Sequence, residues 1–217
     1  VSARLGESDW FVIEADEYDT AFFDKRSKFL HYRPDVLLIG NLEFDHADIF
    51  SSLEDIKKQF SHLLLSVPSN GIVVINSDEL NLRDVLAQGC WSKVVEFSCQ
   101  DESCEWFAQA VTEDASKFDV FQSGRLLGRV TWSLFGAHNM ANALGAIASC
   151  SQAGVNPLEA CRCLSDFELP KRRLERLNSQ GSIALFDDFA HHPTAIKSTL
   201  KSIQAAAPGK RDIAVNE

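Results

Sequence analysis

Acidic side chains follow directly after a short apolar run near the start of the sequence. The stretch FVIEADEYD (residues 11–19) places Glu14, Asp16, Glu17 and Asp19 behind the apolar residues 10–13. A second polar group, Asn41, Glu43, Asp45 and His46, follows the apolar run 36–39. Unpaired buried carboxylates are costly or take up a proton, and a divalent cation removes this difficulty. Together the two groups predict a Mg²⁺ or Mn²⁺ site; taken singly, each residue is better explained as a cap.

Another set of candidates lies in the stretch GAHNMAN (residues 136–142), at the expected start of a helix. His138 and Asn142 are four residues apart and share a helix face, and with Asn139 they offer the donors and acceptors that an adenine edge needs. The alternative is that Asn139 caps the helix and His138 is a hydrogen-bonded core residue.

Basic and polar residues gather later in an otherwise acidic chain. The stretch PKRRLER supplies Lys171, Arg172, Arg173 and Arg176, and DDFAHHP supplies Asp187, Asp188, His191 and His192. A guanidinium beside a crevice can close over a polyphosphate, although such a charge run is more often a solvated face. Asp188 is a candidate for a ribose hydroxyl and His191 for phosphate or substrate. A two-histidine metal site competes with this interpretation, and helix capping by His192 and Pro193 is the simpler one.

No phosphate-binding loop of the type G-x-x-x-x-G-K-[ST] occurs in the sequence. The only Gly-Lys pair, Gly209-Lys210, closes a predicted helix where a phosphate loop would open one. A triphosphate cradle is therefore absent or lies upstream of Val1.

The elements that position these residues follow from the apolar pattern. The runs 10–13, 36–39 and 72–75 are short, unbroken and rich in β-branched or aromatic residues, which predicts strands buried on both faces of a parallel sheet. Their polar ends would converge on one crevice, since ligands bind beyond the carboxyl ends of such strands. Residues 51–68 have helical spacing, with Ser51 and Glu54 as a capping box and Pro68 as the stop.

The later part of the sequence predicts a hairpin, helices and a second unit. Residues 117–134 alternate about a Ser123-Gly124 turn and predict an antiparallel hairpin attached to the sheet. Helices follow at 137–153, closed by Gly154, and at 157–167, opened by Asn156. The first domain should end near Leu169. From Pro170 the sequence predicts two strands flanking a turn at 178–181, a helix with Ile196, Leu200 and Ile203 on one face, and a strand opening at Asp212.

Composition limits the possible partners. The 217 residues carry a net charge of −10, which argues against nucleic acid and anionic membranes. No apolar run approaches the roughly 20 residues that cross a bilayer, and no secretory signal is seen, so we expect a cytoplasmic protein. The six cysteines predict reduced thiols, with a zinc site as a minor alternative, built from Cys99, Cys104, Cys161 and Cys163.

Five motifs taken in order, IEADEYD, NLEFDHADIF, GAHNMANALGAIA, KRRLE and DDFAHHPTAI, resemble the ATP-dependent Mur ligases of bacterial cell-wall synthesis. The resemblance spans nearly the whole chain. The stretch EADEYDTAFFDKRSKFLHYRP is more similar to the peptidoglycan-recycling branch than to the L-alanine-adding branch. The resemblance implies that residues 1–169 are the central ATPase domain without its phosphate loop, and residues 170–217 the start of a Rossmann-like C-terminal domain. The expected fold is therefore α/β, a mostly parallel sheet flanked by helices, with a small antiparallel hairpin.

The resemblance also implies a reaction and a set of roles. The family joins the carboxylate of UDP-N-acetylmuramate to the amine of a peptide, here the murein tripeptide L-Ala-γ-D-Glu-meso-diaminopimelate, after ATP converts the carboxylate to an acyl phosphate. By motif match, Glu14 and His46 resemble the Mg²⁺ ligands and Arg173 the arginine that meets the terminal phosphates. Three residues, His138, Asn139 and Asn142, resemble the adenine pocket, and Asp188 the ribose contact. Lys25, Arg26 and Lys28 are substrate candidates from charge alone, and His191 is a further one.

The sequence departs from the family in one region and leaves other functions open. Some branches carry a carbamylated lysine about fifteen residues after the histidine; here Phe60 and Ser61 lie near that point, so no such role is assigned. We predict that the isolated chain does not turn over ATP. The alternatives are an L-alanine ligase, a non-catalytic UDP-sugar-binding or partner-binding remnant, and a metal-dependent phosphoesterase that uses Asp16, Asp45, His46, Asp188 and His191.

Overall fold

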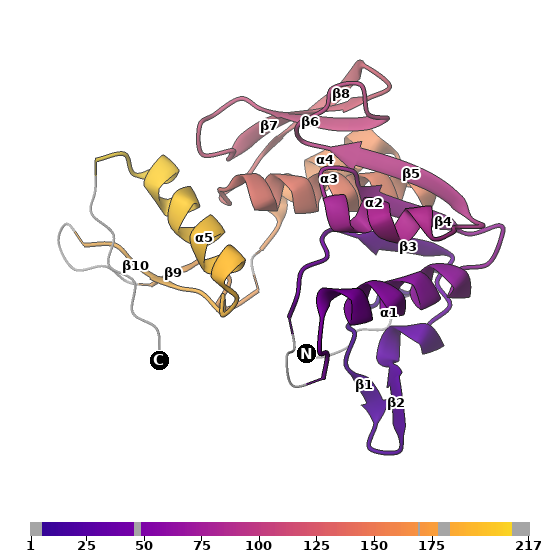
Figure 1. Ribbon diagram of the computed structural model, residues 1–217. Coiled ribbons are helices and arrows are strands. Elements are labelled where there is room, and N and C mark those ends of the chain that lie inside the picture. The colour runs from indigo at the N-terminus through magenta and orange to yellow at the C-terminus, as the bar shows by residue number, and fades with distance from the viewer. Residues whose placement is uncertain (1–5, 46–48, 169, 178–182, 210–217) are drawn as a thin grey trace.

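The computed structural model describes residues 6–45, 49–168, 170–177 and 183–209. Its centre is a six-stranded sheet with the order β3-β4-β5-β6-β7-β8 (Figure 1). The strands β3 (Val36–Ile39), β4 (Ile72–Asn76), β5 (Lys93–Ser98) and β6 (Trp106–Ala110) are parallel neighbours. The strands β7 (Lys117–Gln122) and β8 (Arg125–Thr131) continue the sheet in antiparallel pairs. This confirms the predicted α/β fold with an antiparallel hairpin.

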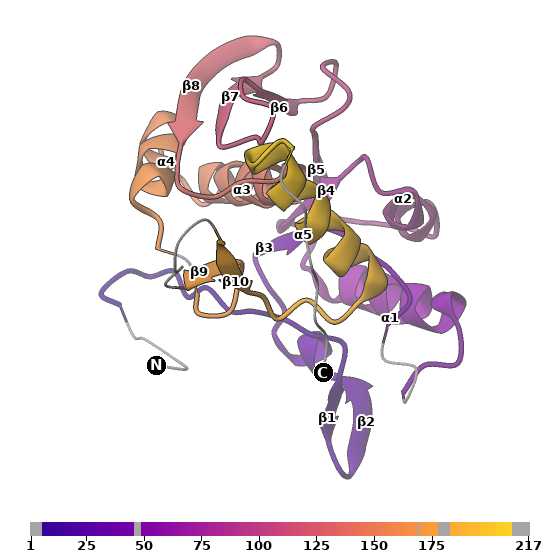
Figure 2. The same ribbon diagram turned by 90° about the vertical axis from the view of Figure 1, so that its left-hand side faces the viewer.

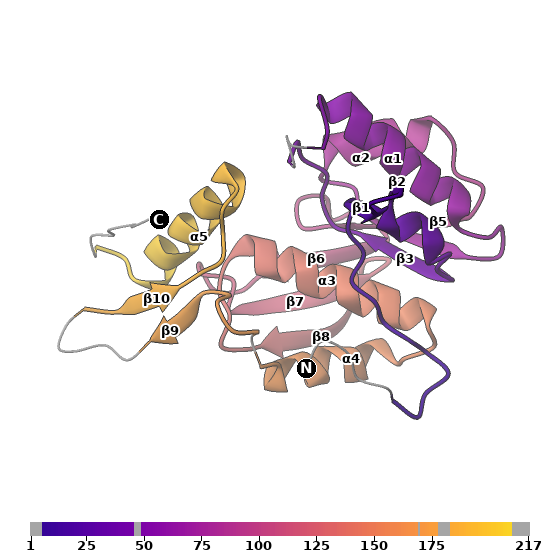
Figure 3. The same cartoon turned by 90° about the horizontal axis from the view of Figure 1, so that it is seen from below.

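Helices cover both faces of the sheet (Figures 1 and 3). In β4, Val73 and Ile75 share a cluster with the helices α1 (Leu53–Ser66) and α2 (Leu80–Ala87). Val74 belongs instead to the cluster with α3 (Ala137–Gln152) and α4 (Pro157–Cys163). Successive strand side chains point to opposite faces, so an unbroken apolar run serves both layers at once. Two short 3₁₀ turns, η1 (Lys28–His31) and η2 (Leu164–Asp166), complete this part.

The first of the three predicted strands is wrong. Residues 10–13 form no strand, and Trp10 and Val12 are 47% and 93% exposed. An isolated extended run gains hydrogen bonds and burial only beside another strand, and the only described strand paired with β3 is β4. The chain instead forms a small hairpin from β1 (Asp19–Ala21) and β2 (Asp24–Ser27), which projects away from the sheet (Figure 1). Residue Leu38 of β3 is 40% exposed, so β3 is not buried on both faces.

The predicted capping box of α1 is displaced by one residue. The N-cap is Ser52, whose Oγ accepts a hydrogen bond from the Asp55 backbone N–H at 3.2 Å and donates to the Asp55 carboxylate at 3.0 Å. Glu54 instead forms an ion pair with Lys57 at 3.2 Å. Both serines precede an acidic residue by three positions, so spacing alone did not separate them. The prediction of Ser51 and Glu54 was therefore wrong by one position.

The hairpin and the next helix are confirmed; the helix predicted at 157–167 ends earlier, since α4 stops at Cys163 and the 3₁₀ turn η2 follows it. Ser123 and Gly124 have φ values of 49° and 75°, which is the left-handed pair that a two-residue hairpin turn requires. The helix α3 is followed by Gly154 at a φ of 88°. The side chain of Asn156 caps α4 by accepting from the backbone N–H groups of Leu158 and Glu159.

The chain ends in a C-terminal module, by which we mean residues 170–177 and 183–209. It contains β9 (Glu175–Leu177), β10 (Leu185–Asp187) and α5 (Pro193–Ala206), with β9 and β10 antiparallel. Figure 2 shows the module in front of the sheet. The predicted turn at 178–181 and the strand at Asp212 lie outside the described residues. Across the described part of the chain, no helix has the length and apolar character needed to span a bilayer.

Candidate functional site

A cleft of about 980 Å³ lies where the carboxyl ends of β3 and β4, helix α3 and the C-terminal module come together. Its walls contain six of the predicted site residues: Glu14, His138, Asn139, Asn142, Arg173 and Asp188. These come from four separate stretches of sequence, and the fold brings them to one cavity. His46 lies outside the described residues, so the predicted pair of Glu14 and His46 stays a prediction.

One wall of the cleft is rich in carboxylates. Glu14, Asn41, Glu43, Asp45 and Glu79 line it. Burial raises the pKa of Glu79, and the neighbouring charges of Glu43 and Asp78 raise it further. Like charges gathered in this way favour a bound cation. Within the described residues, however, no three His, Cys, Asp or Glu side chains are grouped as metal ligands.

Another part of the lining is the start of α3. His138 Nδ1 lies 2.9 Å from the hydroxyl of Ser198 in α5, and Asn139 donates from Nδ2 to the Phe135 carbonyl at 2.9 Å. The N-cap of α3 is Gly136, so Asn139 does not take the capping role considered from the sequence. Burial lowers the pKa of His138, and the charge of Asp188 opposes that effect. Asn142 faces Gly40, where an added Cβ would lie 4.0 Å from its Oδ1.

Two arginines pack on one phenylalanine in the C-terminal module. The guanidinium carbons of Arg172 and Arg173 lie 5.4 Å and 5.8 Å from the ring centre of Phe189. Arg172 also pairs with Asp187 at 3.6 Å. Arg173 lines the cleft, so the aromatic ring helps to fix a cation there. The neighbours of Arg173 have left-handed backbones, with φ values of 60° at Arg172 and 54° at Leu174.

Asp188 and His191, the other two site residues predicted in the C-terminal module, differ in whether they line the cleft. Asp188 lines the cleft and accepts a hydrogen bond from Thr199 Oγ1 at 2.6 Å. His191 is outside the lining and is exposed; its Nδ1 lies 3.1 Å from the Phe189 carbonyl oxygen. The structure thus places Asp188 in the cleft and His191 beside it.

The three basic substrate candidates, Lys25, Arg26 and Lys28, form ion pairs with carboxylates in and near the β1–β2 hairpin. Lys25 pairs with Asp19 at 2.6 Å and Lys28 with Asp16 at 3.3 Å. Arg26 contacts Asp24 through two nitrogens, at 2.9 and 2.7 Å, and lowers the pKa of that carboxyl group. None of the three is in the lining of the cleft. Of the residues proposed for a phosphoesterase, Asp16 is likewise outside the lining.

The region around Phe60, where some branches of the family carry a carbamylated lysine, has no lysine facing the cleft among the described lining residues. Phe60 lines the cleft and packs edge-on against Phe29, with ring centres 5.5 Å apart. The nearby Lys57 is buried and pairs with Asp84 at 2.7 Å, and this bond raises its pKa. Carbamylation needs a neutral amine, so a lysine held in the charged form is unsuited to it. This agrees with assigning no such role.

The four cysteines of the minor zinc alternative form no metal site. All four lie in the described part of the chain, which contains no group of metal ligands. Burial, together with Asp78, raises the pKa of Cys99 to about 12, so this thiol stays protonated. All six cysteines are free.

No motif in the sequence marks the apolar part of the cleft. Side chains from the segments that follow β8 and α4, and one from the C-terminal module, line it: Trp132, Leu134, Leu164, Phe167 and Leu174. Each has the pattern of an ordinary core residue, so no local signal separates them from the rest of the core. An apolar surface with a few convergent polar groups is typical of small-molecule sites.

Comparisons with known proteins agree with this geometry. Residues 2–150 match the Mur ligase middle domain, and residues 172–216 match the Mur ligase glutamate ligase domain. A protein of Escherichia coli K12, named UDP-N-acetylmuramate–L-alanyl-γ-D-glutamyl-meso-2,6-diaminoheptandioate ligase, is 50% identical over the whole chain. A protein of Haemophilus influenzae with the same name is 49% identical. The chain spans about half the length of these relatives, 47% and 48% respectively.

A solved structure extends the similarity to three dimensions. The murein peptide ligase of Psychrobacter arcticus 273-4 is 41% identical and has a TM-score of 0.72. The match covers 96% of this chain and 44% of that one. The sheet, its helices and most of the C-terminal module therefore have a counterpart in one known architecture.

Proposed function

The chain belongs to the Mur ligase family, and from that premise we propose that it is the nucleotide-binding core of a peptidoglycan-recycling ligase. The ligase would join the murein tripeptide L-Ala-γ-D-Glu-meso-diaminopimelate to UDP-N-acetylmuramate. Relatives named for this pair of substrates are about half identical to the chain. We assign residues 1–169 to the central ATPase domain and 170–217 to the start of the Rossmann-like domain. The two matched ranges, 2–150 and 172–216, support this boundary.

The cleft carries the proposal. It gathers a carboxylate from Glu14, amide and imidazole groups from α3, and a guanidinium from Arg173 in one cavity. These are the groups that a nucleotide and its metal ion require: oxygen ligands, hydrogen-bond partners for a base, and a fixed positive charge. We place Mg²⁺ at Glu14 and His46, the base at His138, Asn139 and Asn142, and the ribose at Asp188.

ATP and Mg²⁺ fit the cleft only in part. The carboxylate wall suits a hard divalent cation, and the mixed apolar and amide wall suits a purine. The printed sequence contains no G-x-x-x-x-G-K-[ST] loop to hold a triphosphate. We therefore propose that this chain supplies the base, ribose and metal contacts, and that the phosphate cradle is supplied from elsewhere in the functional protein.

The chemistry explains why these groups are needed. A carboxylate does not react with an amine in water because its oxygen is a poor leaving group. ATP supplies the activation by converting it to an acyl phosphate, from which the amine displaces phosphate. The protein's part is positioning and charge neutralisation. Arg173, held on Phe189, would lie against the transferring charge, and Glu14 would hold the cation.

The other properties that we propose agree with this function. The net charge of −10 is unfavourable for nucleic acid, and the substrates are small anions that need local cations or metal. Six free thiols are what a reducing compartment such as the cytoplasm maintains.

The test is a chimera in which this chain replaces the corresponding residues of the E. coli relative. ADP release should require both UDP-N-acetylmuramate and the tripeptide. Replacing Glu14 by Gln or Arg173 by Ala should lower kcat by about 100-fold or more. Lys171→Ala is the matched control, since Lys171 is a neighbouring exposed cation outside the cleft lining and should have little effect.

Two outcomes would contradict the proposal. Turnover with L-alanine but not with the tripeptide would assign the chain to the other branch of the family. Hydrolysis of a phosphate ester with Mn²⁺ and without ATP would favour the phosphoesterase.

A further inference from the structure

His192 connects the C-terminal module to the loop after β3, across 148 positions of sequence. Its Nε2 lies 3.2 Å from the backbone carbonyl oxygen of Phe44, and its Nδ1 lies 3.4 Å from Glu43 Oε2. The side chains of His192 and Glu43 are 27% and 31% exposed, and Phe44 is 40% exposed, so the contact with Phe44 is open to solvent.

His192 is also the N-cap of α5. Its Nδ1 accepts a hydrogen bond from the Thr194 backbone N–H at 3.3 Å, and Pro193 follows at the first helical position. This confirms the capping interpretation of His192 and Pro193. The capping bond uses Nδ1, whereas the contact with Phe44 uses Nε2, so the two ring nitrogens have separate tasks.

The contact joins the two sides of the cleft. On the module side, His192 follows Asp188 by four residues, and Asp188 is itself tied to α5 through Thr199. On the other side, Phe44 lies in the loop between Glu43 and Asp45, both of which line the cleft. A hydrogen bond to the Phe44 carbonyl therefore fixes the backbone of the carboxylate wall relative to the module.

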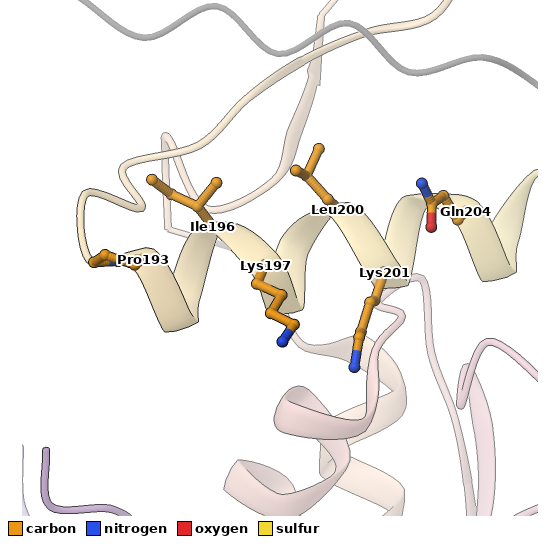
Figure 4. Close-up of a pocket in the computed structure, with 6 residues that line it drawn as sticks. All are labelled: Pro193, Ile196, Lys197, Leu200, Lys201 and Gln204. Atoms are coloured by element: carbon orange, nitrogen blue, oxygen red, sulfur yellow. The ribbon is translucent and has the colours of Figure 1, made fainter.

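Among the described residues, two further contacts between α5 and the start of α3 involve polar side chains. Ser198 contacts His138, and Ser202 packs against Gly136, where an added Cβ would clash with the Ser202 hydroxyl. Ile196 and Leu200 point to one side of α5 and Lys197 and Lys201 to another, as Figure 4 shows, and all four line a groove made of residues of that helix. The module also packs the ring of Phe186 in β10 against Phe135, with centres 6.2 Å apart, but polar contacts predominate at α5 itself. Polar contacts permit more relative motion than apolar ones, so the His192 contact at the start of α5 can strongly affect the position of this helix.

We propose that His192 is a positioning residue: its Nε2 bond to the Phe44 carbonyl holds the start of α5 against the carboxylate wall and thereby sets the separation of Arg173 from Glu14. The consequence for catalysis rests on the proposed function, but the link itself does not. Neutral imidazole with its proton on Nε2 and the imidazolium form both donate from Nε2 to the carbonyl. The link is therefore independent of the protonation state, and only the partner of Nδ1 changes between Thr194 N–H and Glu43.

Two substitutions separate the tasks of the two nitrogens. His192→Asn places an amide oxygen near the Nδ1 position, which preserves the cap of α5 but is too short to reach Phe44. His192→Gln extends an amide nitrogen toward the Nε2 position, which preserves the link but weakens the cap. If His192 acts only as a cap, Asn is the neutral change; if it acts as a link, Gln is the neutral change.

The first measurement is residual dipolar coupling of backbone amides in the 217-residue chain. In the wild type and in His192→Gln, the sheet and α5 should fit one alignment tensor. In His192→Asn, the alignment of α5 should fall roughly twofold below that of the sheet, because the module samples more orientations. Unchanged couplings within the sheet show that the variant is folded. Equal alignment of sheet and α5 in His192→Asn would overturn the proposal.

The second measurement is steady-state kinetics in the E. coli chimera. We expect His192→Asn to lower kcat with little change in the KM for ATP, and His192→Gln to restore kcat. A fall in both variants alike would indicate a purely structural role and contradict the proposal. The couplings need no ligase activity, so an inactive wild-type chimera would count against the proposed function while the link is still tested.

Discussion

His138 has a base-binding role in the proposed function and a structural contact with α5. Its imidazole is partly buried and lies beside Ser198, and burial lowers its pKa. The folded protein therefore favours neutral His138, whereas the unfolded chain titrates at the ordinary value. Stability from this group is fully present above the ordinary pKa and is lost as pH falls through that value toward the lowered one.

This loss of stability at low pH can be tested at His138. Between pH 7.5 and 5, the free energy of unfolding of the wild type should fall, and His138→Asn should lose less over the same range. Asparagine places an amide near the Nδ1 position, so the contact with Ser198 is retained without a titrating ring. Urea denaturation at several pH values measures the effect.

The control for this prediction is His62→Gln, since His62 is exposed on α1. It should keep the pH dependence of the wild type. An equal pH dependence in His138→Asn and the wild type would show that burial of His138 contributes nothing to acid destabilisation.

At the scale of elements, the start of α1 has two adjacent serines that could each serve as the N-cap. Ser51 and Ser52 each precede an acidic residue by three positions, yet only Ser52 bonds to the helix. We predict that Ser52→Ala lowers the free energy of unfolding by about 1 kcal/mol, because one backbone N–H of the first turn loses its acceptor. Ser51→Ala is the matched control and should change stability by less than about 0.5 kcal/mol. Chemical denaturation measures both, and the reverse order would restore the cap predicted from the sequence.

The same scale explains which strands could be predicted. The run 72–75 became β4 because it has hydrogen-bonded neighbours on both sides, β3 and β5. Residues 10–13 have the same apolar pattern but form no strand. The apolar pattern of a segment indicates only that its side chains can be buried. Hydrogen bonding to a neighbouring strand decides whether the segment becomes a strand.

At the scale of the whole molecule, the cleft provides charge and hydrogen-bond partners but no recognisable phosphate loop. We therefore predict that the isolated chain releases no ADP in a coupled assay with ATP, Mg²⁺, UDP-N-acetylmuramate and tripeptide. Binding is a separate matter, and ATP with Mg²⁺ should still raise the unfolding temperature of the chain if the base and metal contacts form.

Two results would change this view. ADP release from the isolated chain would show that it needs no further phosphate cradle. An unfolding temperature that does not respond to ATP and Mg²⁺ at any concentration would favour the non-catalytic remnant.

The sequence by itself determined the family and several elements: local spacing was enough for the hairpin at Ser123 and Gly124 and for α3 with Gly154, and the order of the motifs was enough for the family. Turns and helix ends depend on the few residues around them, so they can be predicted locally. Only the tertiary structure decided that Arg173 packs on Phe189 and that His192 reaches the Phe44 carbonyl. Both contacts join residues whose distance is set by the packing of whole elements, which no local pattern encodes.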